Sequence, residues 1–122
     1  MVGRVLAYGL FGCATEYAFT VLAGRPKPPH PVMLPVYGLA APLFGPVHDL
    51  VRGANLPLRA LTYGLVILAV EYFTGRLLRR AGVVAWDYSR ARWNVARVTR
   101  LDYLPLWSLH GLALERLAER LD

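Results

Sequence analysis

The sequence predicts an all-α, polytopic membrane protein with four transmembrane helices, the second kinked or broken by prolines. Hydrophobic residues make up 56% of the 122 residues, which is more than a soluble chain of this size can cover with polar side chains. Four apolar stretches approach the roughly 20 residues that a helix needs to cross about 30 Å of hydrocarbon. The length allows one domain, so we expect a single integral membrane domain over residues 1–122.

The four spans are expected at residues 5–23, 31–51, 56–78 and 101–114. The third is the clearest, because "ALTYGLVILAV" (residues 60–70) contains no charged residue. The second contains four prolines, each of which lacks a backbone donor, so we expect a kinked or broken helix whose freed carbonyls are satisfied within a bundle. The fourth is short and is expected to be tilted or partly interfacial.

The connections follow from turn-forming residues. "GRPKPPH" (residues 24–30) predicts an extended turn and "RGAN" (residues 52–55) a tight reversal. The third loop, residues 79–100, is the longest. "LFGC" at residues 10–13 has the outline of a lipoprotein cleavage box, but its phenylalanine and the single preceding arginine are untypical. We therefore expect Cys13, the only cysteine, to pack as a small apolar residue.

The basic residues predict a membrane orientation. Of the 14 basic residues, 13 are arginine, a bias that also raises nucleic acid as a partner. The arginines lie between apolar runs rather than along one helix or arm, so we expect a lipid bilayer and no nucleic acid. Nine of the 14 fall in the loops after the first and third spans. The positive-inside rule then places both long loops in the cytoplasm and both termini outside, in the plasma membrane if the source is bacterial.

Two carboxylates within the spans are conspicuous, because an ionisable group inside a membrane needs a partner or a purpose. Glu16 and Glu71 lie at similar distances from the ends of the first and third spans, which finish on the same face. At about 1.5 Å per residue the two carboxylates are expected at similar depth. "AWDYSRARWN" (residues 85–94) emerges on that face and is expected to cover a polar chamber.

The polar residues expected around this chamber come from spans and loop alike. They are Glu16, Tyr37, Glu71, Trp86, Asp87, Tyr88, Asn94 and Asp102, with Arg76, Arg97 and Arg100 as counter-charges. In one interpretation the two glutamates are neutralised or protonated and only lock helices together. In the other they form a binding or proton-handling site.

The opposite face carries a second set of polar residues: His48, Asp49, Arg59 and His110. His48 and Asp49 look like a histidine–carboxylate pair, but adjacent residues on a helix diverge by about 100°, so interfacial solvation is the favoured interpretation.

The stretch "VEYFTGRLLRRAGVVAWDYSRARWNVARVTRLDYLPLW", residues 70–107, resembles the transmembrane protein 229 family and its bacterial relatives, the ABC-transporter type IV membrane proteins. The resemblance rests on the E-x-x-T-G and W-D-Y-S segments, adds Thr74 to the expected polar site, and extends over nearly the whole chain. Many relatives have glycine where this chain has Arg97. The resemblance implies a small multi-pass membrane protein.

By this analogy we expect a membrane component or accessory of a transport system. No nucleotide-binding, metalloprotease or nucleophile-elbow motif occurs, so we expect no cofactor or metal, and ATP hydrolysis would come from a separate ATPase subunit. A homo-oligomer or a larger membrane complex is expected, because one copy encloses little. The alternatives are an intramembrane enzyme acting on a lipid or isoprenoid through Glu16, Glu71 or Asp87, and an assembly factor without a ligand.

Overall fold

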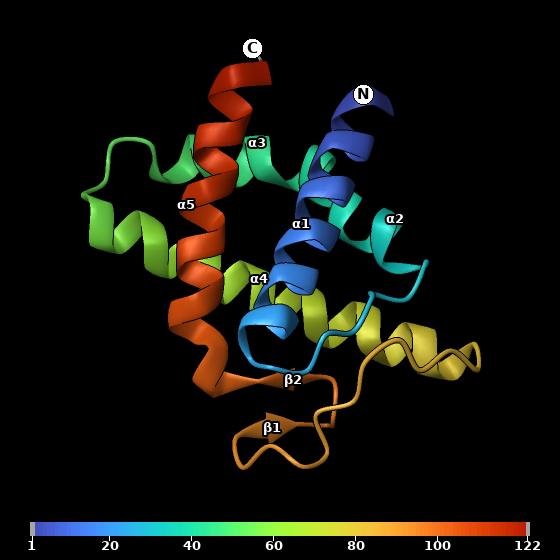
Figure 1. Ribbon diagram of the computed structural model, residues 1–122. Coiled ribbons are helices and arrows are strands. Elements are labelled where there is room, and N and C mark those ends of the chain that lie inside the picture. The colour runs from blue at the N-terminus through green and yellow to red at the C-terminus, as the bar shows by residue number, and fades with distance from the viewer. Residues whose placement is uncertain (1, 122) are drawn as a thin grey trace. The chain divides into compact units, whose positions relative to one another are not determined.

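The computed structural model describes residues 2–121, which form two compact units divided between Pro46 and Val47. The first unit contains α1 (Val2–Leu22), α2 (Met33–Gly38) and the first half of α3 (Ala40–Val51). The second contains the rest of α3, then α4 (Leu56–Arg80), a hairpin of β1 (Asn94–Val95) and β2 (Thr99–Arg100), a 3-10 turn at Leu101–Tyr103, and α5 (Leu104–Leu121) (Figure 1). The chain is mainly helical, as predicted.

In the first unit, α2 packs closely against α1 because both present glycine at the contact. A Cβ on Gly9 would lie 2.5 Å from the carbonyl oxygen of Leu34, and one on Gly12 would overlap the ring of Tyr37. From α2, a Cβ on Gly38 would lie 2.6 Å from Val5. Small residues thus let the two backbones approach, as is common between helices in membranes.

The second predicted span is broken, as its prolines indicate. Helix α2 ends at Gly38 and α3 begins at Ala40. Pro42 has no N–H with which to bond the carbonyl of Gly38, and the N–H of Leu39 bonds Val36 over three residues rather than four. The missing bond divides the segment into helices of 6 and 12 residues.

Helix α4 has well-defined ends. The Asn55 side chain accepts a hydrogen bond from the N–H of Leu58 at 2.9 Å, which caps the first turn. At the other end Gly82 has a φ of 83°, and Val83 N–H bonds the carbonyl of Leu78 at 2.8 Å. This left-handed glycine closes the helix, which runs two residues beyond the predicted span.

Helix α5 differs from the predicted fourth span. It begins at Leu104, after the 3-10 turn, and continues to Leu121 rather than ending near Leu114. Its last two turns carry four charged residues, so the helix continues where the apolar run stops. The β1–β2 hairpin is also absent from the all-helical prediction. Its two ladder pairs join Asn94 to Arg100 and Val95 to Thr99.

In the second unit α5 crosses α4 (Figure 1), again at glycines. A Cβ on Gly64 would lie 2.8 Å from Leu104, and one on Gly111 would overlap the side chain of Tyr63. The side chains of α4 point in three directions that follow from its 3.6-residue period. Arg59 and Tyr63 lie toward α5, Glu71 and Gly75 lie toward the hairpin, and Leu61, Leu65 and Phe73 are exposed.

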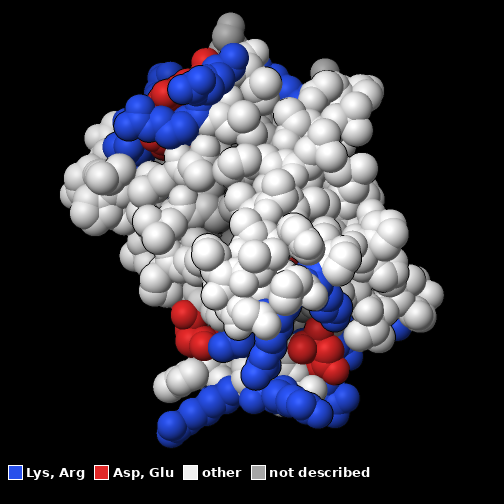
Figure 2. Space-filling model, in the orientation of Figure 1, with Lys and Arg blue, Asp and Glu red and all other residues white. Residues whose placement is uncertain are grey.

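Two helices, α1 and α4, are long and apolar enough to cross a membrane. Only 17% of the apolar window of each is buried, whereas the core helix of a soluble protein would be mostly buried. On the face drawn in Figure 2, the charged side chains gather in separate groups and most of the surface is uncharged. The segment from Met33 to Val51 and α5 do not meet this criterion, so the four-span arrangement stays a prediction.

Candidate functional site

The carboxylate of Glu71, on α4, is held by hydroxyl groups from the third loop and the hairpin. The Tyr88 hydroxyl donates to Oε2 at 3.0 Å, and Thr99 Oγ1 donates to Oε1 at 2.7 Å. Glu71 is half-buried, and Thr99 is only 4% exposed. One hydrogen bond to each oxygen offsets part of the cost of removing a carboxylate from water. The W-D-Y-S segment therefore contacts Glu71 directly through its tyrosine.

The hairpin reaches Glu71 because α4 has no side chain at Gly75, one turn further on. A Cβ there would lie 2.6 Å from Val98 Cβ and 2.9 Å from Trp86. Trp86 Nε1 donates to the carbonyl of Val98 at 2.6 Å, and Val98 is fully buried. Trp86 and Val98 thus fill the surface that Gly75 leaves open, which places the next residue, Thr99, against Glu71.

A second set of bonds fixes the start of the loop. Arg79 Nη2 donates to the Trp86 carbonyl at 3.0 Å and lies 3.4 Å from the Asp87 carboxylate. The Ser89 N–H donates to Asp87 Oδ1 at 2.9 Å. That backbone hydrogen bond is the main reason why the pKa of Asp87 is lowered, with a further contribution from the charge of Arg79. Asp87 caps a turn on the surface, while Tyr88 beside it points to Glu71.

The hairpin turn depends on Asn94 and on two left-handed residues. Asn94 Nδ2 donates to the Ala91 carbonyl at 2.7 Å, and its Oδ1 accepts from the Arg97 N–H at 3.1 Å. Ala96 and Arg97 have φ values of 54° and 66°. These values lie in the region that glycine adopts without strain. Asn94 therefore shapes the backbone of the turn.

The arginines predicted as counter-charges have other contacts. Arg100 bonds the carboxylate of Asp102 at 2.6 Å and 3.0 Å, and its guanidinium lies 3.9 Å from the centre of the Tyr103 ring. Arg76 donates to the Tyr72 hydroxyl at 3.2 Å. The side chain of Arg97 is exposed on the turn. These contacts thus lie at the surface around the loop.

The remaining predicted site residues lie apart from this cluster or within α4 itself. Thr74 Oγ1 donates to the carbonyl of Val70 at 2.7 Å, a bond within the helix. In the first unit, the Tyr37 hydroxyl donates to Glu16 Oε1 at 2.7 Å, so α1 and α2 are linked by a carboxylate–tyrosine pair. Glu16 and Glu71 belong to different compact units, and their common chamber stays a prediction.

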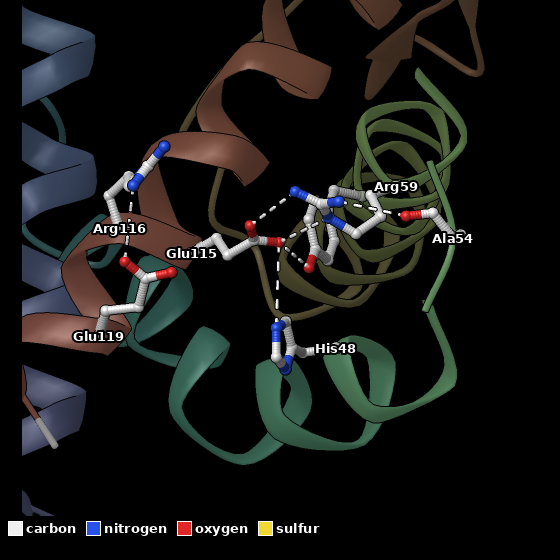
Figure 3. A network of polar contacts seen from close by, with 7 residues as sticks. His48, Ala54, Arg59, Glu115, Arg116 and Glu119 are labelled. Carbon is white, nitrogen blue, oxygen red and sulfur yellow. Dashed lines mark hydrogen bonds and ion pairs between the residues drawn. The ribbon is translucent and has the colours of Figure 1, made fainter. Parts of the chain in front are cut away.

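Another polar cluster, centred on Glu115 of α5, was not predicted. Arg59 donates to both carboxylate oxygens, at 3.3 Å from Nε and 3.1 Å from Nη2, and the Tyr63 hydroxyl donates at 2.6 Å. His48 Nε2 lies 4.0 Å from the same carboxylate (Figure 3). The side chain of Glu115 is only 11% exposed. His48 thus faces Glu115, while Asp49 beside it is exposed.

The sequence contains a signal for this cluster. Arg59 and Tyr63 are one helical turn apart, and so are Gly111 and Glu115, so each pair shares a helix face. Tyr63 packs on Gly111, which brings the charged members of the two pairs together. Aligning these two pairs where α5 crosses α4 would have predicted an ion pair between Arg59 and Glu115.

All three clusters pair a glutamate with a tyrosine hydroxyl. The two clusters of the second unit lie toward opposite ends of α4. Arg59 and Glu71 are 12 residues apart, or about 18 Å along the helix axis. The intervening residues, Ala60 to Val70, are uncharged. This arrangement places charged groups at two positions along α4, on either side of an uncharged segment.

Residues 5–121 match the family described as "Putative ABC-transporter type IV". No solved structure matches the chain. The match includes α4, nearly all of α1, the W-D-Y-S loop and the Glu115 cluster, and therefore nearly all of the residues discussed above. The likeness to the transmembrane protein 229 family stays a prediction. The chain belongs to the ABC-transporter type IV family.

Proposed function

We propose that this chain is a small multi-pass integral membrane protein that acts as a membrane component or accessory of a transport system. The observation that carries the proposal is the family match over residues 5–121. The exposed apolar faces of α1 and α4 support a lipid environment, because burying such faces in a bilayer removes them from water. In this proposal the segment from Met33 to Val51 and α5 complete a four-span domain over residues 1–122.

The polar site of this domain is centred on Glu71. Its two hydroxyl partners come from outside α4, Tyr88 from the loop and Thr99 from the hairpin. Opening of the loop would therefore expose the carboxylate, and closing would surround it. In the proposed site the Glu71 carboxylate holds a proton or cation in transit.

One copy has too few helices to enclose a pathway, so we propose that it works in an oligomer or with a larger membrane subunit. A separate ATPase subunit supplies the energy, since the sequence contains no P-loop. The basic loops after α1 and α4 lie in the cytoplasm, where such an ATPase would be bound.

The proposal is tested in two steps. The tagged full-length chain should remain in the membrane pellet after alkaline carbonate extraction, and purification in a mild detergent should recover an ATPase, identified by mass spectrometry. Release of the chain by carbonate would refute the membrane assignment. Recovery of an integral but solitary chain, with no ATPase, would refute the transport role.

The role of Glu71 is tested on the recovered complex. Glu71→Gln keeps the shape and an acceptor for hydrogen bonds but cannot carry a charge. A proton or cation site predicts normal assembly and a loss of ATP-driven turnover, whereas a purely structural role predicts normal turnover. Glu119→Gln is the matched control, because Glu119 is a 61% exposed carboxylate on α5. Normal turnover in Glu71→Gln and Glu16→Gln combined would remove the site.

A further inference from the structure

The segment that follows the apolar part of α4 is strongly basic and exposed. Between Arg76 and Arg100 there are seven arginines and one acidic residue, Asp87, which is already paired with Arg79. Five of these arginines are exposed: Arg76, Arg80, Arg90, Arg92 and Arg97. Lys and Arg side chains gather over the hairpin end of the second unit in Figure 2. We call this surface, formed by the five exposed arginines, the arginine surface.

The guanidinium groups of this surface are largely unneutralised within the chain. Among residues 2–121, the side chains of Arg80, Arg90, Arg92 and Arg97 make no hydrogen bond or ion pair. Like charges this close in sequence repel one another. An anion that binds several of them would relieve the repulsion, and guanidinium binds phosphate oxygens in a bidentate manner.

Apolar side chains lie among and before these arginines, which indicates the kind of anion. Trp93 is 57% exposed and Val84 is 58% exposed, although both lie between arginines. On α4 the last exposed large apolar residues are Phe73 and Leu77, and Leu77 lies within one turn of Arg80. Exposed tryptophan next to basic residues, at the end of an apolar helix face, is typical of the depth at which phospholipid headgroups lie.

We propose that the arginine surface binds the headgroups of anionic phospholipids. The inference rests on the proposed membrane location and adds a ligand class to the loop that covers Glu71. Bound lipid would hold the outer side of the loop at the bilayer surface while Tyr88 and Thr99 hold its inner side on α4. The lipid composition would thereby affect how firmly the loop closes over Glu71.

The test measures lipid binding by the full chain in non-ionic detergent micelles. Brominated phosphatidylglycerol or brominated phosphatidylcholine is titrated in, and quenching of tryptophan fluorescence reports contact. Each arginine near a membrane surface contributes roughly fivefold to binding, so Arg90→Gln, Arg92→Gln and Arg97→Gln combined should raise the phosphatidylglycerol midpoint about a hundredfold. Phosphatidylcholine should quench all variants alike.

The matched control is Arg52→Gln, Arg116→Gln and Arg120→Gln combined, which removes the same charge from exposed arginines elsewhere. It should keep the wild-type midpoint. Equal losses in both variants, or equal quenching by the two lipids, would overturn the proposal, as would competition by inorganic phosphate or a polynucleotide at concentrations below the lipid midpoint. Carbonate extraction of the membranes from which each variant is purified separates these outcomes from failure of the membrane assignment.

Discussion

Replacing Gly75 by alanine should release the third loop from α4. The new Cβ would lie 2.6 Å from Val98 Cβ, 2.8 Å from Val98 Cγ1 and 2.9 Å from Trp86 Cζ2, and side chains do not tolerate such distances. Overpacking of this kind costs about 1–3 kcal/mol, while alanine returns about 0.5–1 kcal/mol of helix propensity. The expected net loss is about 1–2 kcal/mol, or roughly 4–8 °C in the melting temperature.

Thermal unfolding in detergent measures the stability, and limited trypsin digestion measures release of the loop. Arg90 and Arg92 are exposed and would be cleaved faster once Trp86 leaves Gly75. Gly3→Ala is the control, because the added Cβ would meet nothing within 4 Å among residues 2–121 beyond the adjoining part of α1 itself; it should melt at or slightly above the wild-type temperature. A Gly75→Ala protein with unchanged melting and unchanged cleavage would show that the loop does not pack on α4 at this point.

Three further predictions concern single side chains. Arg97→Gly should raise the free energy of unfolding by about 1 kcal/mol in denaturant titrations, because a φ of 66° strains any residue with a Cβ; a loss of stability would contradict the assigned turn. Tyr63→Phe should lower the melting temperature by an amount equivalent to about 1–2 kcal/mol, since Glu115 loses a charged hydrogen bond, and an unchanged melting curve would refute that bond. The folded pKa of Asp87 is lowered, so its bond to Ser89 is present above the ordinary pKa near 4 and is lost as the pH falls through the folded pKa. Amide hydrogen exchange at Ser89 should accelerate as the pH falls through that folded pKa. In Asp87→Asn, which has no carboxylate to titrate, the exchange rate should show no such acceleration.

The helix ends that the sequence predicts well are those marked by local chemistry. Asn55 is a capping residue and Gly82 is a left-handed terminator, so the bounds of α4 follow from a few neighbouring residues. The end of α5 does not follow from neighbouring residues, because the apolar run ends at Glu115 and Arg116 while the helix continues. Their charges are accommodated on the helix by partners and by water, which hydropathy alone does not register.

In the candidate site too, contacts that follow from local sequence were predicted, and contacts between distant segments were missed. Tyr88 was expected near Glu71 because the loop leaves the same end of α4, and the structure brings them together. Thr99 was missed because it reaches Glu71 through a hairpin whose turn, at Ala96 and Arg97, lacks the usual glycine. Glu115 was missed because its partners are about 50 residues away in the chain, and only pairing of the α4 and α5 faces reveals them.

Helix α4 carries both Arg59, which contacts α5, and Glu71, which contacts the hairpin, and this has a mechanical consequence. A rigid helix turns as one body, so twisting it by one residue, about 100°, would pull Arg59 from Glu115 and Glu71 from Thr99 in the same motion. Sliding it along its axis would shear both contacts together as well. Any such displacement of α4 would therefore break the contacts at both ends of the second unit together.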